Sequence, residues 1–416
     1  MMHHLPWGTL VTLYVDHPTM DILGTKGDSL KGKKIVLCVT GSIAAVETIK
    51  LARELIRHGA EVQGVMSKDA CTIIHPWALE YATGRKAITE ITGDVEHVAY
   101  CGQRKEAYDL LLIAPCTANT IGKIASGVDD TPVTTFATTA IGSKIPVMIV
   151  PAMHGTMFEH PLVNENIKKL ESIGLKFIMP KTEEKIAKLP DNDEIVLNVE
   201  RALSGSPLKG KKILITSGSN FEPIDPIRVL TSRSTGRMGV ELALQAYRCG
   251  AEVTLVHRSK LGVRGIKEVF AESAGDMANA VLNELGKGYD IYISAAAISD
   301  FTVEPAAQKI SSSKGLTITL KPAVKILDRV RHDFPKLFIV AFKAETVDEK
   351  ELVERAIKRM DESGANMVVA NQFGGIRDPE VNEVFIIQAD GSVTASKGRK
   401  SAVSRDILNT VAEYFK

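Results

Sequence analysis

The feature that most restricts the fold is a repeated alternation of short apolar runs with longer stretches of helical periodicity. Residues 34–40, KIVLCVT, are continuously apolar and rich in β-branched side chains, which is typical of a strand buried on both faces of a parallel sheet. Residues 44–59 follow with apolar side chains at helical spacing and end at Gly59, a favourable helix terminator. Because this alternation recurs in both halves of the chain, it predicts an α/β fold with two doubly wound, mostly parallel sheets.

The same patterns predict the remaining elements. In the first half we expect a helix at 162–173 and strands at 61–67, 109–116, 144–153 and 176–180. In the second half we expect helices at 238–250, 276–288 and 401–415, strands at 213–215, 252–257, 338–345 and 367–371, and a strand that runs into a loop over 289–301. Residues 383–394 predict a hairpin that turns at Asp390-Gly391.

The length of 416 residues is too great for one ordinary core and suggests two or three domains. Residues 202–210, ALSGSPLKG, are rich in Gly, Ser and Pro and separate the two periodic regions. We therefore expect an N-terminal arm at 1–31, a first domain at 32–201, a linker at 202–210 and a second domain at 211–416.

Charge and cysteine content exclude several classes of function. The net charge of +1 gives no electrostatic reason to bind nucleic acid or an anionic membrane. Five cysteines form no CxxC pair, which fits a reducing compartment better than a disulfide framework or a zinc site. No apolar run approaches the roughly 20 residues needed to span a bilayer, and we see no secretory signal. The sequence therefore predicts a cytoplasmic protein.

The stretch 211–239 holds the most prominent loop. A short apolar strand leads into about 20 residues rich in Ser, Gly, Asn and Pro, and helical periodicity resumes only after 234–237. Structureless loops longer than about 12–15 residues are usually functional. A strand that leads through small residues into a helix is also how open α/β sheets hold phosphate-bearing ligands.

Polar and small residues of the first half gather where its strands end. They are Gly41, Ser42, Ser67, Thr117, Ala118, Asn119 and His154. Open parallel sheets bind ligands at that edge, and serine hydroxyls can donate hydrogen bonds to a phosphate. Since no G-x-G-x-x-G follows the first strand, a mononucleotide such as FMN fits better than a dinucleotide. A lone histidine such as His97 is usually a surface or satisfied core residue.

The second half shows a more strongly charged edge. Gly218, Asp300, Lys343 and Asn371 follow or end strands, and Lys309 lies in the loop QKISSSKG. An acid, several lysines and hydroxyl-rich loops suit a nucleoside triphosphate with Mg²⁺. Taken singly, Lys309 could be a solvated loop charge and Lys343 could pair with Glu345. There is no G-x-x-x-x-G-K-[ST], so a P-loop enzyme is excluded.

Motifs of the first half resemble those of flavin-dependent cysteine decarboxylases. They are GSIAA (41–45), PCTANT (115–120), DDTPVTT (129–135) and PAMHGTMFEHP (151–161). The greatest similarity is to the decarboxylase half of the bifunctional family that ligates phosphopantothenate to cysteine and decarboxylates the product in coenzyme A synthesis. The resemblance implies a flavodoxin-like domain, bound FMN, and a trimeric building block. The residues implied to bind FMN are Gly41, Ser42, Ser67, Thr117, Ala118, Asn119 and Thr134.

This resemblance assigns chemistry to two histidines. The flavin oxidises the cysteinyl thiol to a thioaldehyde, CO₂ is lost, and the resulting enethiolate is protonated and reduced. His97 occupies the position of the family's essential histidine, as a base or as a group that orients the carboxylate. His154 stands where the family usually has asparagine. The bacterial enzymes carry a catalytic cysteine in a flap, but residues 181–195 contain none, so the proton donor stays open.

The second half resembles the ligase of the same family through LITSGSNFEPIDPIR, STGRMG, SAAAISDF, QKIS, FKAE and VAN, in that order. The resemblance implies a Rossmann-like domain that activates the carboxylate as an acyl-cytidylate with CTP before cysteine attacks. The implied nucleotide-binding residues are Gly218, Ser294, Ala295, Ala296, Asp300, Lys309, Lys325, Phe342, Lys343 and Lys358. Asp300 would also contact the metal, Mg²⁺ or Mn²⁺, and Lys309 would be catalytic. The implied substrate-binding residues are Arg228, Ser232, Ser234, Thr235, Gly236, Arg237 and Asn371.

Alternatives stay open at this point. Ser232 replaces an asparagine that helps bacterial ligases process the acyl-cytidylate, and the sequence does not decide between CTP and ATP. A NAD(P)-dependent reductase lacks its glycine fingerprint here, whereas a flavin-binding regulatory or scaffold homologue that has lost one activity is a more serious rival. The resemblance further implies dimeric ligase domains joined to trimeric decarboxylase domains, plausibly in a dodecamer.

Overall fold

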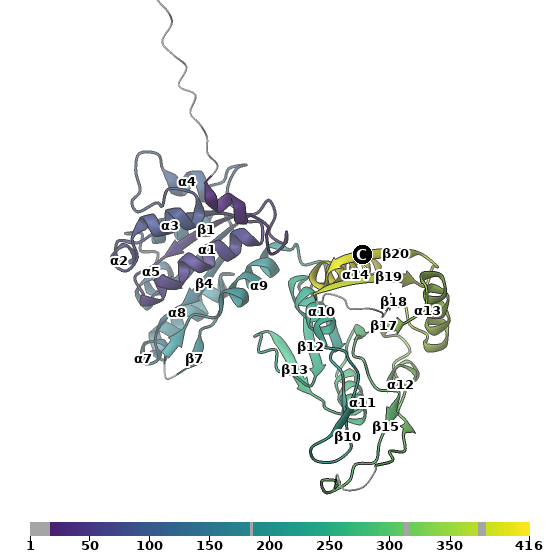
Figure 1. Cartoon of the computed structure of the whole chain (residues 1–416). Helices are drawn as coiled ribbons and strands as arrows, with labels where there is room; N and C mark the ends of the chain where they lie inside the picture. The colour runs from purple at the N-terminus through teal and green to yellow at the C-terminus, as the bar shows by residue number, and fades with distance from the viewer. Residues whose placement is uncertain (1–16, 184–185, 312–315, 373–379) are drawn as a thin grey trace, which may run out of the picture. The chain divides into compact units, whose positions relative to one another are not determined.

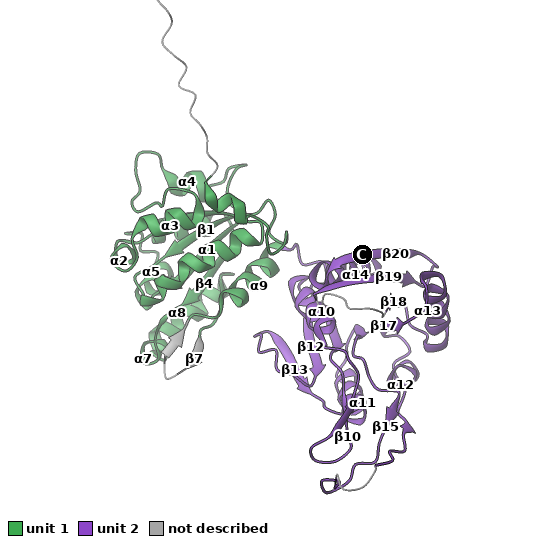
Figure 2. Ribbon diagram, viewed as in Figure 1, with its two compact units in different colours: residues 1–203 green, residues 204–416 purple. Residues whose placement is uncertain are grey.

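The computed structural model describes residues 17–183, 186–311, 316–372 and 380–416. Of the expected N-terminal arm, residues 1–16 lie outside the described residues. The described chain forms two compact units, Met1–Leu203 and Ser204–Lys416, which are coloured separately in Figure 2. Each unit is built around its own sheet (Figure 1).

The first unit contains a parallel sheet in the strand order β2-β1-β3-β4-β6. Its strands are β1 (Lys34–Val39), β2 (Glu61–Met66), β3 (Leu110–Cys116), β4 (Val147–Pro151) and β6 (Lys176–Phe177). Each pair of neighbours is parallel, so the expected parallel sheet is confirmed, although β6 covers only the first two residues of the strand expected at 176–180. The order reverses between β1 and β3, and ligands of open α/β sheets bind at such a switch point.

Helices cover both faces of this sheet because successive strand residues point to opposite sides. Ile35 and Leu37 of β1 join one buried cluster, which α1 (Thr48–Arg57), α3 (Pro76–Thr83) and α9 (Asn192–Leu203) complete. Val36 and Cys38 join the cluster on the other face. That second cluster includes residues of α4 (Glu96–Cys101), α5 (Ala118–Ser126), α6 (Pro132–Gly142) and α8 (Pro161–Ser172).

Shorter elements complete the first unit. They are η1 (Pro18–Ile22), η2 (Ile43–Glu47), α2 (Lys68–Cys71), β5 (Met153–His154), α7 (Gly155–Phe158), β7 (Lys181–Glu183) and β8 (Ile186–Lys188). The expected helix at 44–59 is therefore divided between η2 and α1. The expected strand at 144–153 is divided between β4 and β5, and β8 pairs with both β5 and β7.

The second unit has a longer sheet in the order β13-β12-β9-β14-β17-β18-β19-β20. Its strands are β9 (Lys212–Thr216), β12 (Glu252–His257), β13 (Ile266–Phe270), β14 (Ile291–Ser294), β17 (Phe338–Glu345), β18 (Met367–Gln372), β19 (Val381–Gln388) and β20 (Val393–Arg399). Pairing is parallel from β13 to β18, and β19 and β20 are added antiparallel. This arrangement confirms the mostly parallel sheet and the hairpin at Asp390-Gly391.

Helices of the second unit are α10 (Arg237–Arg248), α11 (Ala274–Leu285), α12 (Ile326–Asp333), α13 (Glu349–Ser363) and α14 (Lys400–Tyr414). The sequence patterns missed α12 and α13. Within the described residues, no helix is long and apolar enough to cross a membrane.

One expectation for this unit is wrong. The loop within 211–239 is not structureless, because β10 (Phe221–Pro223) pairs antiparallel with β11 (Val229–Thr231) inside it. The expectation that a strand runs into a loop over 289–301 is confirmed, because β14 ends at Ser294. The chain then leaves the sheet and forms the short β15 (Phe301–Thr302), which pairs with β16 (Lys321–Pro322).

Candidate active sites at the two sheet edges

Helix N-termini meet the carboxyl edge of the first sheet and bring hydroxyl groups with them. Ser42 caps η2 by accepting a hydrogen bond from Ala44 N at 3.4 Å, and Ser67 caps α2 by accepting one from Ala70 N at 3.2 Å. Because an accepting serine keeps its own proton, both hydroxyls can still donate to a ligand. Thr117 caps α5 in the same way.

A close backbone approach shapes the same edge. A Cβ placed on Gly41 would lie 2.4 Å from Cβ of Asp69, so only glycine lets the end of β1 pass α2 at this distance. Thr40 joins β1 to β3, since its Oγ1 donates to Pro115 O at 2.9 Å and accepts from Thr117 N at 3.0 Å. Sequence reasoning missed Thr40, although it directly follows an apolar strand. Ala118 and the exposed Asn119 begin α5 beside it.

Thr134, one of the residues implied to bind FMN, is bonded within the protein. It is 1% exposed and forms a capping box with Thr131 at the start of α6. Its Oγ1 donates to Thr131 O at 3.0 Å and accepts from Asp130 N at 3.2 Å. Its proton is therefore used inside the protein, where Thr134 shapes the loop before α6, and its implied contact with FMN stays a prediction.

His97 lies in the first turn of α4, half-buried. Its Nδ1 is buried and has no hydrogen-bond partner among the described residues. Since buried polar atoms are nearly always satisfied, an orphan of this kind points to a partner supplied by a ligand or a second chain. Burial raises the pKa of Cys101 in the same helix to about 12, so that thiol is a poor proton donor.

His154 is exposed and lies at the junction of β5 and α7. Its Nδ1 is 3.0 Å from Oγ1 of Thr156. The backbone of the cysteine-free flap lies alongside, because His154 pairs with Ile186 of β8. The structure therefore places the flap backbone next to His154, and residues 184–185 of that flap lie outside the described residues.

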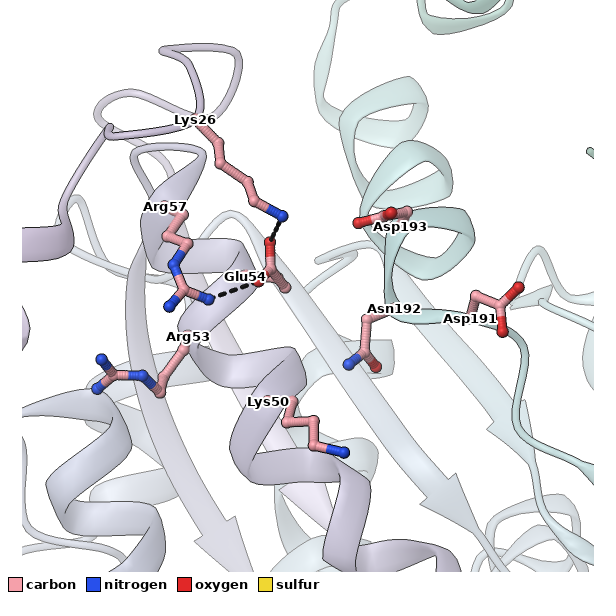
Figure 3. A pocket seen from close by; sticks show the side chains of 8 residues that line it. All are labelled: Lys26, Lys50, Arg53, Glu54, Arg57, Asp191, Asn192 and Asp193. Carbon is pink, nitrogen blue, oxygen red and sulfur yellow. Dashed lines mark hydrogen bonds and ion pairs between the residues drawn. The ribbon is translucent and has the colours of Figure 1, made fainter.

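A cavity of about 420 Å³ in the first unit contains none of the predicted site residues. Figure 3 shows that its lining is almost entirely charged: Lys26, Lys50, Arg53, Glu54, Arg57, Asp191, Asn192 and Asp193. Lys26 and Arg57 both pair with Glu54. Most of these side chains come from α1 and the start of α9, while Lys26 follows η1 and Asp191 directly precedes α9. Nothing about this ion-paired surface cavity indicates a reacting group.

In the second unit, three glycines hold β9 and α10 together. Gly218 turns the chain after β9 with φ of 97°, and Gly236 precedes α10 with φ of 77°. A Cβ on Gly236 would lie 2.7 Å from Cα of Gly218, and one on Gly239 would lie 2.5 Å from Cβ of Ser217. These are the roles that glycines play in a phosphate-binding strand–turn–helix. Here the first is separated from the other two by the inserted β10–β11 hairpin.

The loop that precedes α10 is held by its own hydroxyls. Ser217 Oγ donates to Gly236 O at 2.7 Å, and Ser232 Oγ accepts from Ser234 N at 3.4 Å. Ser232, Thr235 and Arg237 are exposed. Arg237 forms an ion pair with Glu380, so the field of its charge is partly compensated.

Several predicted nucleotide-binding residues meet at the carboxyl edge of the second sheet. Ser294 ends β14 opposite Thr216 of β9, and Ala296 N donates to Oγ1 of Thr216 at 3.3 Å. Ala295 lies between them, half-buried. Phe342 and Asn371 lie near the same edge, late in β17 and β18.

The charged groups of this edge lie in the loops beyond β14. Asp300 is exposed, and its carbonyl oxygen accepts from Ala323 N at 2.9 Å, two residues before the exposed Lys325 that caps α12. Lys309 is exposed and makes no ion pair with any residue that the structure describes. Among the residues that the structure describes, no group of three His, Cys, Asp or Glu could hold a metal ion.

The two remaining lysines behave differently. Lys343 pairs with Glu345 at 2.9 Å, which also pairs with Arg355. Lys358 pairs weakly with Glu362 at 3.9 Å on the outer surface of α13. It lies nine residues after the helix start, or about 14 Å at 1.5 Å per residue, toward the opposite edge of the sheet. We therefore correct the placement of Lys358 at the nucleotide site.

The sequence reasoning missed buried polar residues in the same loops. Asn220, Glu222 and Asp225 are each no more than 2% exposed. Asn220 Nδ2 donates to Glu222, and Arg228 Nη1 donates to Oδ2 of Asp225 at 3.0 Å. The available signal was the run SNFEPIDP, where acidic residues alternate with apolar ones in a loop.

Comparison with known proteins assigns both units. The family described as Flavoprotein matches residues 23–204, and the family described as DNA/pantothenate metabolism flavoprotein C-terminal domain matches residues 208–415. The coenzyme A biosynthesis bifunctional protein CoaBC of Thermococcus kodakarensis is 50% identical over 90% of this chain and 93% of its own length. That of Methanocaldococcus jannaschii is 39% identical over 96% and 98%.

A solved structure of the C-terminal domain of a protein of that name is 33% identical and covers 50% of this chain and 98% of its own, with a TM-score of 0.43. The full-length similarity to the archaeal proteins and the two family matches in series agree with the motifs found in the sequence. The chain therefore belongs to the CoaBC family of bifunctional coenzyme A biosynthesis proteins, which combine a ligase with a flavoprotein decarboxylase.

Proposed function

We propose that the second unit ligates 4′-phosphopantothenate to cysteine with CTP and Mg²⁺, and that the first unit decarboxylates the product, 4′-phosphopantothenoylcysteine, with FMN. The observation that carries this proposal is the pair of family matches in series, at 23–204 and 208–415. The division of residue types between the two sheet edges supports it. Neutral hydroxyls gather at the first edge, and lysines with an acid gather at the second.

The residues of the first edge fit a flavin mononucleotide. Gly41 lets the end of β1 pass close to α2, and Ser42 and Ser67 keep protons to donate to a phosphate at short helix N-termini. Bound FMN would supply the two-electron oxidation and the return of electrons that allow the substrate carboxylate to leave as CO₂. His97, with its orphaned Nδ1, would hold or remove a proton beside that carboxylate. His154 would contact the carboxylate from the flap side.

The residues of the second edge fit carboxylate activation. The exposed ammonium of Lys309 would neutralise negative charge at the α-phosphate as pyrophosphate leaves. Asp300 would bind Mg²⁺ together with the nucleotide phosphates. Gly218, Ser294, Ala295, Ala296 and Phe342 would surround the nucleotide, with Lys325 and Lys343 close to its phosphates. Arg228, Asn371 and the segment 232–237 would hold the pantothenate side.

We further propose that first units assemble as trimers and second units as dimers, with a dodecamer as the closed assembly. Large apolar side chains exposed on each unit support self-association. In the first unit Ile43 is 77% exposed and Trp77 is 74% exposed, and in the second unit Ile227 is 67% exposed. Light scattering of the purified protein measures the assembly directly.

The experiment that tests the function is incubation of the purified protein with phosphopantothenate, cysteine and either CTP or ATP, with mass detection of both products. Flavin absorbance is recorded on the same sample. Formation of 4′-phosphopantetheine supports both activities. Accumulation of phosphopantothenoylcysteine without release of CO₂, or flavin absorbance with neither product, would favour a homologue that has lost one activity or both.

A further inference from the structure

The loop that carries Lys309 is fastened to the β10–β11 hairpin by hydrogen bonds that involve buried side chains. Near the sheet, Ser299 N donates to Oδ1 of Asn220 at 2.7 Å. Further out, Thr302 Oγ1 donates to Oε2 of Glu222 at 2.6 Å. Glu222 is itself fixed, because its Oε1 accepts from Ala274 N at 2.7 Å where α11 begins. The hairpin therefore fixes the path of the loop that carries Lys309.

The fastening continues to the residue next to Lys309. Ala306 N donates to Ile224 O at 2.9 Å, and Ile310 N donates to Oδ2 of Asp225 at 3.1 Å. The last bond involves the peptide group that joins Lys309 to Ile310. Because that peptide is bound, the Cα atom of Lys309 is held even though its side chain is exposed.

Asp225 makes a dense set of contacts for one carboxylate. Its Oδ1 accepts from Ile227 N and from Arg228 N, both at 2.8 Å, which closes the turn of the hairpin. Its Oδ2 accepts from Arg228 Nη1 and from Ile310 N. Arg228 Nη1 also donates to Ile310 O at 3.1 Å, so Ile310 is bound at both its N–H and its C=O.

The charge state of Asp225 agrees with this geometry. Burial alone would raise the pKa of the carboxyl, but hydrogen bonds from Ile227, Ile310 and Arg228 N–H groups and the guanidinium of Arg228 together hold it below its ordinary value. The carboxylate is therefore ionised at neutral pH and accepts every one of these bonds.

We propose that Asp225 is a positioning residue of the ligase half, which acts through Ile310 and Arg228 to hold Lys309 where charge develops on the activated carboxylate. The inference rests on the proposed role of Lys309 in ligation. It assigns a function to the inserted hairpin, which would couple the pantothenate side at Arg228 to the nucleotide side at Lys309. Asp225 touches neither substrate.

The test compares Asp225→Asn with Asp390→Asn, using the full-length protein. The Asn amide can still accept the two turn bonds, but it places a donor opposite Ile310 N–H and Arg228 and breaks the link to Lys309. Asp390 is a matched control, because its Oδ1 accepts from Ser392 N at 2.9 Å in a turn at the opposite edge of the sheet. Ligation is measured as the sum of both products from phosphopantothenate, cysteine and CTP.

We expect Asp225→Asn to lower kcat for ligation by about 10- to 100-fold, the scale of a small misplacement of a catalytic group, and Asp390→Asn to leave it unchanged. The KM for cysteine and the decarboxylation of added phosphopantothenoylcysteine should stay within about 2-fold for both variants. Equal ligation rates for the two variants would overturn the proposal.

A second comparison separates positioning from a general loss of structure. Asp225→Asn is also made in a Lys309→Ala background. Because no ammonium is left there to be positioned, the Asp225 change should lower the residual ligation by less than about 2-fold further. The same fold-loss in both backgrounds, which unfolding would produce, would contradict the proposal. If Lys309→Ala ligates at the normal rate, the proposed function of Lys309 is wrong; if only Asp225→Asn does so, the positioning role alone is wrong.

Discussion

At the carboxyl edges of the two sheets, the chain passes from the first strand to the following helix in different ways. In the first unit, β1 passes through Gly41 and Ser42 directly into η2, and hydroxyls that cap short helices line the edge. In the second unit, the equivalent step from β9 to α10 contains a whole hairpin, and buried carboxylates fasten the neighbouring loop to it. The switch points of both sheets lie beside these first strands.

The difference shows which kind of group each edge offers to a negatively charged ligand. Backbone N–H groups and neutral hydroxyls can hold a resident phosphate without mobile cations, as suits a cofactor that stays bound. Long loops with lysines suit charged reactants that enter and leave, but a long loop places its charges poorly unless it is cross-linked. The buried carboxylates of the second unit supply that cross-linking.

The variant Lys309→Ala gives the strongest test of this contrast. Because it removes a cation from the charged edge only, we expect amide formation to be abolished, by at least about 100-fold, while flavin stays bound. Product masses and flavin absorbance are measured on one preparation. An unchanged ligation rate would show that Lys309 at the second edge does not stabilise the charge that develops during ligation.

The first edge is tested by His97→Asn. We expect release of CO₂ from phosphopantothenoylcysteine to fall by about 100-fold or more, as for loss of a general base, with ligation unaffected. His332→Asn is a suitable control, since that histidine is exposed on α12 of the other unit. Normal decarboxylation by the His97 variant would show that its unpartnered nitrogen has no chemical role.

The crossing of β9 and α10 is tested by Gly239→Ala. A methyl group there would lie 2.5 Å from Cβ of Ser217, so strand and helix must separate, which should lower the free energy of unfolding by about 1–3 kcal/mol. Gly275→Ala in α11 is the control, because its nearest contact would be Ser273 Oγ at 3.7 Å. Denaturant unfolding measures the free energy of unfolding of both variants. Equal values would show that the close contact of Gly239 with Ser217 does not stabilise the second unit.

The smallest effect concerns acid stability. Burial would raise the pKa of Glu284, but hydrogen bonds from Lys267, Lys287 and Tyr289 lower it to about 2 from its ordinary 4.5. A lowered pKa stabilises the fold above pH 4.5, and that stabilisation is lost as the pH falls toward 2.

Glu284→Gln should therefore remove about 1 kcal/mol of stability at pH 6 and flatten the loss of stability in acid, since both lysines are half-exposed and screened. Urea unfolding at pH 6 and pH 3 measures this difference. Glu304→Gln, which breaks only the exposed pair with Lys321, is the control and should change the pH dependence much less, because solvent screens that pair.

Strands with continuous apolar sequence were the most predictable part of the fold. FIVAFKAE was expected as a strand and forms β17 over the same residues, Phe338–Glu345. By contrast, α6 was missed because its sequence, PVTTFATTAIG, is rich in β-branched residues that favour strands on propensity alone. The helix is stabilised by its capping box at Thr131 and by its buried face. Only the buried face depends on tertiary packing.

The location of the candidate sites followed from topology, because parallel strands bring their carboxyl ends to one edge. What the sequence could not supply was contact between distant loops. The bond from Ile310 N to Asp225 joins positions 85 residues apart, and no local pattern marks either partner. His97 likewise carried no local signal, and its importance was expected only from the family resemblance.

The three-glycine crossing has a consequence for how the second site can change. Because Gly218 and Gly236 are in contact, the ends of the inserted hairpin are already closed, and the entropic cost of loop closure rises by only about 0.6 kcal/mol for each doubling of its length. Strand and helix would keep their places whatever lies between them. The insertion can therefore change in length without disturbing the sheet, provided that its buried residues still fasten the Lys309 loop, and substrate choice can change while the scaffold is preserved.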